Sequence, residues 1–576
     1  MQIATPNPLQ DLIPLKAIDE TLPTRHDPDA SRPVIELHPE NHVYRDSVAQ
    51  HLDWEVTADY GRPDGVLKRV YLVNGLFPGP TIEARSGDRL IVNVTNSLKD
   101  ESISIHWHGL HIENAMDGAV GVTQRPILPG STFTYNFTIP ADQNGTFWYH
   151  AHSGLIRADG LYGGLIVHAP SPKSTVRGLL AHADDNGHDS YSKDILLLVG
   201  DWYHRFADQV YSWYMRAASF GNEPVPDSLL INGEGRFDCS MAVPARPVDC
   251  INRQMNLSYL DANSDITYRV RVINTGSVAG FTLRFENRDF TLIQVDNIDV
   301  EPQESDSAGI LYPGQRMDVI LRPSNNSPSS MTINLDNECF RYPNPALTSV
   351  QTFPISKSPN NSSPVASPRN TPISLSDVAT KKSLLSALPE KAHQTHVLYT
   401  KIEKLSRNHN IPYGFFNRTS WKPPTTTPLI DIPREEWDEN QLVISTGAST
   451  PPLSSDHDNG IWIDLVVNNL DDSGHPFHLH GHHFYILTTY KAPIGWGAYN
   501  PFVDASPPGL APQATISPRK GTPYDLSRAQ LRDTVYIPSR GYAVLRFRAD
   551  NPGIWLFHCH IIWHQASGMA MLLQID

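Results

Sequence analysis

The chain of 576 residues is long enough to form several hydrophobic cores, and its length is typical of three or four domains. Its formal net charge is −15, from 46 basic and 61 acidic residues, and no run of Lys or Arg occurs, which argues against a nucleic-acid partner. No stretch reaches the roughly 18 apolar residues of a transmembrane helix, so we predict no membrane span.

Residues 1–65 are interpreted as an N-terminal extension whose first forty residues are rich in Pro, Asp and Glu. This segment has no apolar core of the length that a secretory signal needs. Sequons of the type Asn-x-Ser/Thr nevertheless favour secretion, at Asn93, Asn136, Asn144, Asn256, Asn325, Asn360, Asn361 and Asn417. We expect an extracellular glycoprotein whose signal peptide is absent from this sequence; the alternative is an intracellular protein.

From residue 66 onward, short apolar runs are separated by Gly, Pro, Asn and Asp, as in residues 70–73 and 90–94. This pattern is typical of strands in a sandwich or a Greek-key barrel. Helical periodicity is scarce and confined to short pieces such as residues 208–218. The sequence therefore predicts an all-β fold.

A loose internal repeat divides these strands into three sets. The segment 128–135, which leads to 145–150, is echoed by 537–544, which leads to 553–558, and a third copy covers 311–319. We predict three related β-domains, at 66–171, 172–355 and 396–576. Residues 356–395 would form a linker, since their first part is rich in Pro, Ser and Asn.

Four His-x-His pairs are the strongest motif: His106 with His108, His150 with His152, His478 with His480, and His558 with His560. On a strand, both rings of such a pair point to the same face. The middle repeat carries no such pair at residues 279–286. We therefore expect domains 1 and 3 to supply four imidazoles each, to a site at their interface. Eight histidines suit three metal ions and leave room for a small ligand.

Cys559 lies between His558 and His560, so its side chain should point to the opposite face of the same strand. His564 and Met569 follow it, and His475 opens an earlier His-rich segment. Two imidazoles, a thiolate and a weak thioether are the ligands of a blue-copper site, whereas structural zinc needs a stronger fourth ligand. The alternative is a lone buried cysteine among core histidines.

These motifs resemble those of the multicopper oxidases, the family of laccases, ferroxidases and ascorbate oxidases, over nearly the whole chain. The resemblance implies three cupredoxin-like Greek-key β-barrel domains in tandem and four copper ions. It implies a type 2 copper on His106 and His478, a type 3 pair on His108, His150, His152, His480, His558 and His560, and a type 1 copper on His475, Cys559 and His564 with Met569 axial. Electrons would pass from a substrate at the type 1 site to dioxygen, which is reduced to water.

Two acidic residues also match the family, by resemblance alone. Asp117 matches an acid that the family places beside the trinuclear centre, although Asp before Gly is also common in turns. Glu223 resembles a ferroxidase carboxylate, and its alternative is a solvated loop acid. The chain departs from the family at Ile562, where ferroxidase-type enzymes have an acid, and at Arg125, where a disulfide cysteine is frequent.

The first functional prediction is a laccase-like oxidase of phenolic or aromatic substrates with O2 as acceptor. The alternative is a ferroxidase that oxidises Fe(II). A hypothesis of another class is an electron carrier or copper store, which needs the type 1 ligands but has no use for eight further histidines.

The remaining cysteines carry a prediction of their own. Cys239 and Cys250 are close enough in sequence to close a short disulfide loop, which would fit an oxidising compartment. Cys339 would then remain as a buried free thiol.

Overall fold

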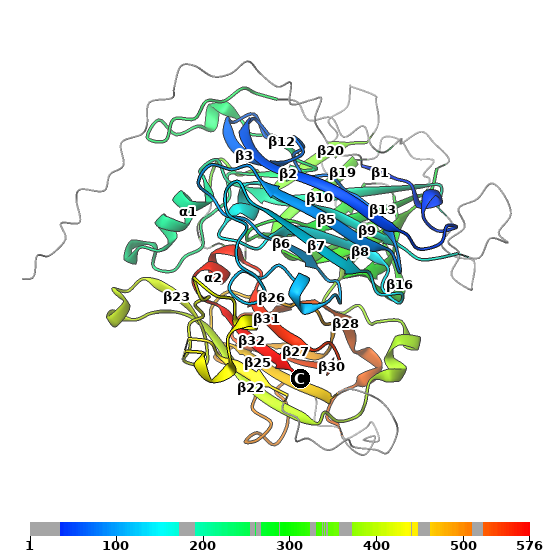
Figure 1. The fold of residues 1–576 in the computed structure, drawn as a ribbon, viewed down its shortest axis with the longest axis vertical. Helices are drawn as coiled ribbons and strands as arrows, with labels where there is room; N and C mark the ends of the chain where they lie inside the picture. The colour runs from blue at the N-terminus through cyan, green and yellow to red at the C-terminus, as the bar shows by residue number, and fades with distance from the viewer. Residues whose placement is uncertain are drawn as a thin grey trace, which may run out of the picture.

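A computed structural model describes residues 35–171, 191–253, 260, 266–286, 288–322, 330–336, 338, 340, 342, 344–355, 371–438, 440–446, 461–509 and 522–576. Strands dominate it, and they form three pairs of sheets (Figure 1). The all-β prediction is confirmed. Cys339 lies outside the described residues, so its state stays a prediction.

Domain 1 consists of two four-stranded sheets. The first contains β3 (Lys68–Val73), β2 (Ala49–Gly61), β5 (Arg89–Asn96) and β7 (Thr132–Thr138), and the second contains β4 (Ile82–Arg85), β9 (Tyr162–His168), β8 (Gly145–Ala151) and β6 (Ile105–His108). In β5, the buried Leu90, Val92 and Val94 alternate with more exposed residues, which gives the sheet one core face. Strand β2 precedes residue 66, so the predicted extension contributes a strand to this domain.

Domain 2 has a sheet of eight strands and a sheet of five. The first contains β12 (Glu234–Gly235), β11 (Ser228–Ile231), β10 (Lys193–Trp202), β13 (Tyr268–Asn274), β18 (Arg316–Leu321), β15 (Phe290–Val295), β16 (Ile298–Ser305) and the N-terminal β1 (Glu36–Leu37). The second contains β20 (Val350–Pro354), β19 (Ser330–Asp336), β14 (Gly280–Phe285), β17 (Ser307–Leu311) and β21 (Ile373–Ser374). Strand β21 lies inside the predicted linker but pairs with β17; residues 356–370 of that linker are outside the described residues.

Domain 3 has sheets of six and five strands. The first contains β23 (Pro412–Phe416), β22 (Gln394–Lys404), β25 (Ile461–Asn469), β30 (Gly541–Ala549), β27 (Phe484–Lys491) and β28 (Gln530–Arg532), and the second contains β24 (Val443–Ser445), β32 (Ala570–Ile575), β31 (Gly553–Cys559), β26 (His475–Leu479) and β29 (Thr534–Ile537). One hydrophobic core runs through domains 2 and 3, while domain 1 has its own.

The internal repeat corresponds to equivalent strands in the three domains. Strands β7, β18 and β30 begin within the three repeat motifs and pair antiparallel with β5, β13 and β25. Each of those partners pairs in turn with a parallel strand, namely β2, β10 and β22. The sequence repeat is therefore a repeat of topology.

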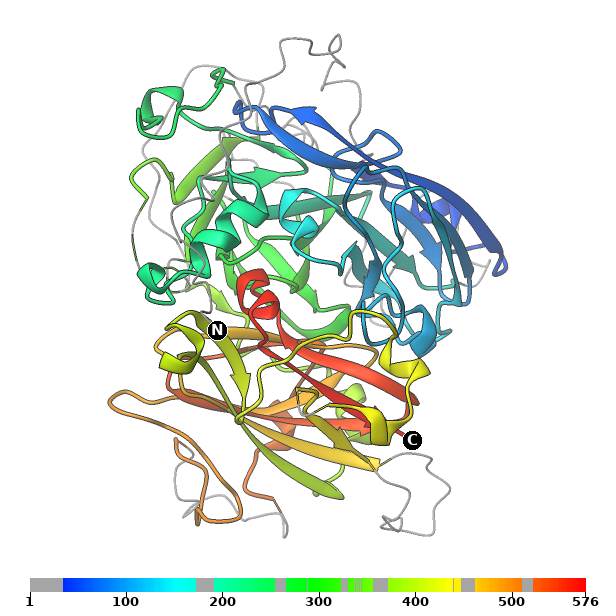
Figure 2. The same cartoon turned by 60° about the vertical axis from the view of Figure 1, so that its left-hand side comes forward.

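The described residues contain two α-helices between the strands. Helix α1 (Ala207–Tyr214) overlaps the helical piece predicted at 208–218, and it buries Ala207, Val210 and Tyr214 along one face. Helix α2 (Ile562–Ala566) lies where domain 3 meets the other two domains, as the red helix of Figure 2 shows. The short 3-10 helices are η2 (Pro39–Asn41), η3 (Asn114–Met116), η4 (Ile156–Asp159), η5 (Ala217–Ser219), η6 (Cys239–Met241), η7 (Lys382–Ala387), η8 (Ser406–Asn408), η9 (Leu429–Asp431), η10 (Arg434–Glu436) and η11 (Leu526–Arg528). No helix among the described residues is of a length and apolarity that could span a bilayer.

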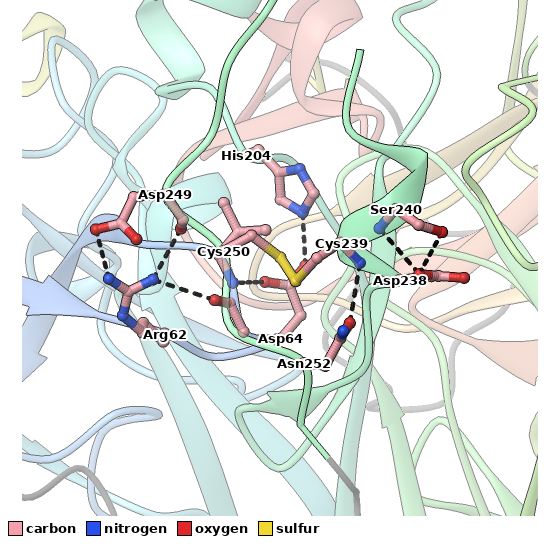
Figure 3. Close-up of a disulfide and its surroundings, with 11 residues drawn as sticks. Arg62, Asp64, His204, Asp238, Cys239, Ser240, Asp249, Cys250 and Asn252 are labelled. Carbon is pink, nitrogen blue, oxygen red and sulfur yellow. Dashed lines mark hydrogen bonds and ion pairs between the residues drawn. A yellow bond between two sulfur atoms is a disulfide. The ribbon is translucent and has the colours of Figure 1, made fainter. Parts of the chain in front are cut away.

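The predicted disulfide between Cys239 and Cys250 is confirmed, with Cα atoms 5.7 Å apart (Figure 3). It closes a loop of domain 2 that is attached to domain 1. The Arg62 guanidinium donates to the main-chain oxygen of Asp249 at 2.8 Å, and a β-bridge joins Val66 to Cys250. The disulfide therefore stabilises a loop that connects two domains.

Candidate metal centres

Strand pairing brings the four His-x-His pairs to the interface of domains 1 and 3. In domain 1, β6 pairs with β8 so that His106 lies opposite His150. In domain 3, β26 pairs with β31 so that His478 lies opposite His558. Side chains directly opposite each other in an antiparallel pair share one face. Strands β6 and β26 face each other across the interface (Figure 1), with His106 Nε2 3.4 Å from His478 Nε2.

The eight predicted imidazoles form three groups whose nitrogen atoms lie within 4.8 Å of one another. The groups are His106 with His108 and His478, His108 with His150 and His560, and His152 with His480 and His558. Each group combines residues of domains 1 and 3, so neither domain alone could form the cluster. The predicted location at the domain interface agrees with this geometry.

The hydrogen bonds of these rings fix which nitrogen faces the cluster. Main-chain oxygens accept from the Nδ1 atoms of His106 at 2.8 Å and of His478 at 2.9 Å, which leaves the lone pair on Nε2. Within the described residues, His150 Nε2 and both nitrogens of His560 have no hydrogen-bond partner. Burial lowers the pKa of His560 well below its usual range, so the ring is neutral. Buried, neutral and unpartnered imidazole nitrogens are what a metal cluster requires.

A second cluster lies on the opposite face of β31. Cys559 is fully buried, and its Sγ lies 3.8 Å from His475 Nδ1 and 3.6 Å from His564 Nδ1. Burial would raise the pKa of the Cys559 thiol, but hydrogen bonds from His475 and His564 outweigh burial and lower it to about 7. The site therefore favours a thiolate, the form that binds metals.

Helix α2 brings His564 back to Cys559 and is followed by Met569. The chain turns at Gly568, whose φ of +105° suits glycine. The Met569 N–H donates to the His564 oxygen at 2.9 Å, and the Cys559 N–H donates to the Met569 oxygen at 3.1 Å. Met569 is fully buried, and these main-chain hydrogen bonds connect it to His564 and Cys559 of the cluster.

Each imidazole of this second cluster has a carboxylate partner on its other nitrogen. His564 Nε2 donates to Glu223 Oε1 at 3.1 Å, and His475 Nε2 donates to Asp471 Oδ2 at 2.9 Å. Glu223 is 8% exposed, so the alternative of a solvated loop acid is wrong. Carboxylates in this position orient metal-binding imidazoles and increase their basicity.

Comparison with known proteins identifies the family of this chain. The chain is 31% identical to the iron transport multicopper oxidase FET3 of Gibberella zeae over 91% of this chain and 75% of that protein. It is 30% identical to laccase-2 of Botryotinia fuckeliana over 88% of this chain and 79% of that protein. Three family models described as multicopper oxidase match residues 55–172, 193–351 and 418–576. The chain belongs to the multicopper oxidase family.

The fold agrees with that of a solved member. The crystal structure of a laccase from Botrytis aclada superposes with a TM-score of 0.71, at 27% identity, over 94% of this chain and 90% of that one. The three domains are thus cupredoxin-like, as predicted, and copper is the metal of the family.

Asp117 contacts two histidines of this multicopper oxidase. Its main-chain oxygen accepts from His106, and its carboxylate Oδ2 accepts from His480 Nδ1 at 2.9 Å. Gly118 follows with a φ of +85°, so Asp117 also stands in the turn that the alternative predicted. The turn places the carboxylate against the histidine cluster.

A cavity of about 960 Å³ adjoins the Cys559 cluster on the side of the two carboxylates. Glu223 and Asp471 line it, together with the aromatic rings of Phe220, Phe340 and Trp496. Phe220 is 69% exposed and Trp496 60% exposed, which is unusual for large apolar side chains. The volume is within the range of small-molecule sites.

Two functional carboxylates were not predicted from the sequence. Asp471 is hydrogen-bonded to His475, as described above, and Asp533 Oδ1 lies 3.3 Å from His108 Nε2. Asp471 precedes His475 by only four residues, and this short spacing could have predicted a hydrogen bond between the two side chains. Asp533 is 425 residues from His108, and no spacing rule applies at that separation.

A further group, His42, Glu83 and His168, also has its donor atoms within 4.8 Å. Arg45 Nη2 donates to His42 Nδ1 at 3.0 Å, and His168 Nε2 donates to Glu83 at 2.9 Å. The positive charge of Arg45 beside the His42 ring disfavours the binding of a metal ion there. We interpret this group as packing between the residues before β2 and strands β4 and β9.

Proposed function

We propose that this multicopper oxidase is laccase-like and couples one-electron oxidation of phenolic or aromatic substrates to the reduction of O2 to water. His475, Cys559 and His564 would hold one type 1 copper, with Met569 as a fourth, weaker ligand. His106 and His478 would hold a type 2 copper, and His108, His150, His152, His480, His558 and His560 a type 3 pair. Four coppers would supply the electron transfer and the reduction of O2. The donor sets support this distribution, since the histidine and cysteine ligand atoms converge and all of these residues except the half-buried His152 are buried.

The protein connects the two centres through three consecutive residues. Cys559 belongs to one cluster, while its neighbours His558 and His560 belong to the other. The main chain from Cys559 to either histidine is therefore a short covalent route for electrons. An electron carrier would need only the Cys559 cluster, so the histidine cluster supports an oxidase instead.

Protons need a route as well, and two carboxylates are placed for it. A phenol that loses an electron must also lose its hydroxyl proton, and Glu223 lines the cavity where such a substrate would bind. Asp117 contacts the histidine cluster and would supply protons for the formation of water. Both roles are part of this proposal.

The observation that carries the choice of an aromatic substrate is the cavity beside Glu223. A metal ion needs no space of about 960 Å³ and no wall of Phe220, Phe340 and Trp496. Aromatic side chains pack well on aromatic substrates, because stacked and edge-to-face ring pairs are favourable.

Oxidation of Fe(II) is the second candidate, because the same cavity is rich in carboxylates. Asp471 and Glu223 accept hydrogen bonds from His475 and His564, the imidazoles that would hold the type 1 copper. Glu338, Glu403 and Asp472 also line the cavity. Carboxylate oxygens suit Fe(II), and one relative named above is called an iron transport oxidase.

The variant Glu223→Ala separates these candidates when O2 uptake is measured with a phenol and with Fe(II) across pH. For a laccase-like enzyme we expect lower phenol turnover and a shifted pH profile, with little change for Fe(II). A ferroxidase would instead show a raised KM for Fe(II) alone. Glu83→Ala is the matched control, since Glu83 also accepts a hydrogen bond from a histidine, at 2.9 Å, but away from the cavity. Unchanged kinetics with both substrates would contradict any substrate role for Glu223.

We further propose that the protein is a secreted glycoprotein. The disulfide supports an oxidising compartment. Asn93, Asn136, Asn144 and Asn417 are sequons within the described residues, and none of their side chains is fully buried. Treatment of the protein from culture medium with an endoglycosidase should lower its apparent mass; an unchanged mass would contradict the proposed glycosylation.

A further inference from the structure

Arg316 is a fully buried cation of domain 2 that contacts both other domains. It begins β18, and its Nη1 and Nη2 donate to Oδ1 and Oδ2 of Asp533 in domain 3, each at 2.7 Å. Its Nε donates to the main-chain oxygen of Thr146 in domain 1 at 3.0 Å. One side chain thus joins three domains at the interface that holds the histidine cluster.

Asp533, in turn, contacts a histidine from each copper-binding domain. Its carboxylate Oδ1 lies 3.3 Å from His108 Nε2, and its main-chain oxygen accepts from His478 Nδ1 at 2.9 Å. The Thr534 hydroxyl donates to Asp533 Oδ1 at 2.8 Å and lies 3.2 Å from His108 Nε2. His108 Nδ1 has no hydrogen-bond partner among the described residues, so it is the nitrogen that faces the cluster.

The geometry of this chain of contacts is that of a support for metal ligands. A guanidinium that bonds both oxygens of a carboxylate fixes its plane as well as its position. The fixed carboxylate then determines the ring orientation of His108, as outer partners of ligating histidines do. We propose that Arg316 is a positioning residue, which orients Asp533 and through it His108 and His478. The copper-free domain 2 would then help to shape the trinuclear centre. This inference rests on the proposed function, in which these histidines hold copper.

The chain offers a matched control in Arg546. This residue is also buried, and its Nε and Nη2 donate to Oδ1 and Oδ2 of Asp464, each at 2.7 Å. Both partners lie in the six-stranded sheet of domain 3, and among the described residues neither forms a hydrogen bond or ion pair with the histidine cluster. Lysine in place of either arginine keeps the positive charge but cannot form the bidentate hydrogen bonds to both carboxylate oxygens of the aspartate. A purely structural role predicts similar effects at the two sites.

The test compares R316K with R546K in the copper-loaded enzyme. We expect R316K to retain the blue type 1 absorption, to change the type 2 copper EPR spectrum, and to lower kcat for O2 uptake about tenfold or more with unchanged KM for the phenol. For R546K we expect wild-type type 2 EPR and kcat, even if its melting temperature falls. Copper content per chain is measured for both variants.

A wild-type type 2 EPR spectrum in R316K would overturn the proposal, as would an equal spectral change in R546K. If R316K yields no blue protein, Asn297→Ala decides by the same spectra, since Asn297 Oδ1 accepts from Arg316 Nη2 at 3.0 Å. An altered type 2 spectrum in that variant supports the role of Arg316, and an unaltered one contradicts it. Absence of type 2 copper from the wild-type enzyme would overturn the proposed function as well, so the two failures are distinguishable.

Discussion

The Sγ of Cys559 lies 3.6 Å from Nδ1 of His564, while the adjacent His558 points to the other side of the same strand and belongs to the histidine cluster. One strand and the short helix after it thus contribute to both sites. The thiolate is the feature that a blue copper site depends on most.

Replacement of Cys559 by Ser should therefore abolish the intense blue absorption and essentially all turnover. The histidine cluster does not include the Cys559 side chain, so the variant should still bind copper there. Absorption and EPR spectra with copper analysis check this. A variant that remained blue would contradict the type 1 assignment.

Met569→Leu should raise the reduction potential of the proposed type 1 copper site. An axial thioether stabilises Cu(II), and Leu removes it with little change in volume. A redox titration of the blue band measures the shift. No rise, or a fall, would mean that Met569 is not the axial ligand.

Sequence alone predicted the all-β fold and the histidines, because both rest on local periodicity. A His-x-His pair on a strand fixes the direction of two rings, and Cys559 between two histidines must face the other way. The partnership of Glu223 with His564 depends instead on how domain 2 packs on domain 3, across 341 residues. Arg316 and Asp533 are similarly distant, and no motif relates them. Strand β2 was missed as part of domain 1 because the composition of the first forty residues obscured where the domain begins.

Asp117→Asn tests the proposed proton supply. The amide has the same shape and can remain in the turn before Gly118, but it cannot supply a proton. We expect kcat for O2 uptake to fall by about 10²-fold with unchanged KM for the phenol. Steady-state kinetics with normal copper content and EPR provide the check. If Asp117→Asn kept the kcat of the wild-type enzyme, the proposed proton supply would be contradicted and only the role of Asp117 in the turn would remain.

Replacement of both Cys239 and Cys250 by Ser should destabilise the protein without changing its spectra. The two residues are 11 apart in sequence, and opening a loop of that size costs about 3 kcal/mol. Denaturant unfolding measures this loss. Loss of the disulfide should also weaken the attachment of this loop to domain 1 at Arg62 and Val66. We therefore expect faster proteolysis near residues 239–250. Equal stability of variant and wild type would contradict the stabilising role of the disulfide.

Asp64 should make part of the stability depend on pH. Burial would raise the pKa of this carboxyl, but hydrogen bonds from Ser228 and from His204, the latter drawn in Figure 3, outweigh burial and hold the pKa below its ordinary value. A depressed folded-state pKa stabilises the protein above the unfolded pKa of about 3.9, and the contribution is lost as pH falls through the folded value. Asp64→Asn should thus be less stable than wild type at pH 7, and the difference should narrow below about pH 4. A difference that is constant with pH would contradict this.

The stoichiometry of O2 reduction tests the central claim most directly. The measurement follows phenol oxidation, O2 uptake and hydrogen peroxide together, in the copper-loaded wild-type enzyme. Cooperation of the Cys559 cluster and the histidine cluster predicts that about four one-electron oxidations accompany each O2 consumed, without peroxide, since the reduction of O2 to two waters takes four electrons. Release of peroxide at about two electrons per O2, or no O2 uptake with any donor, would contradict it.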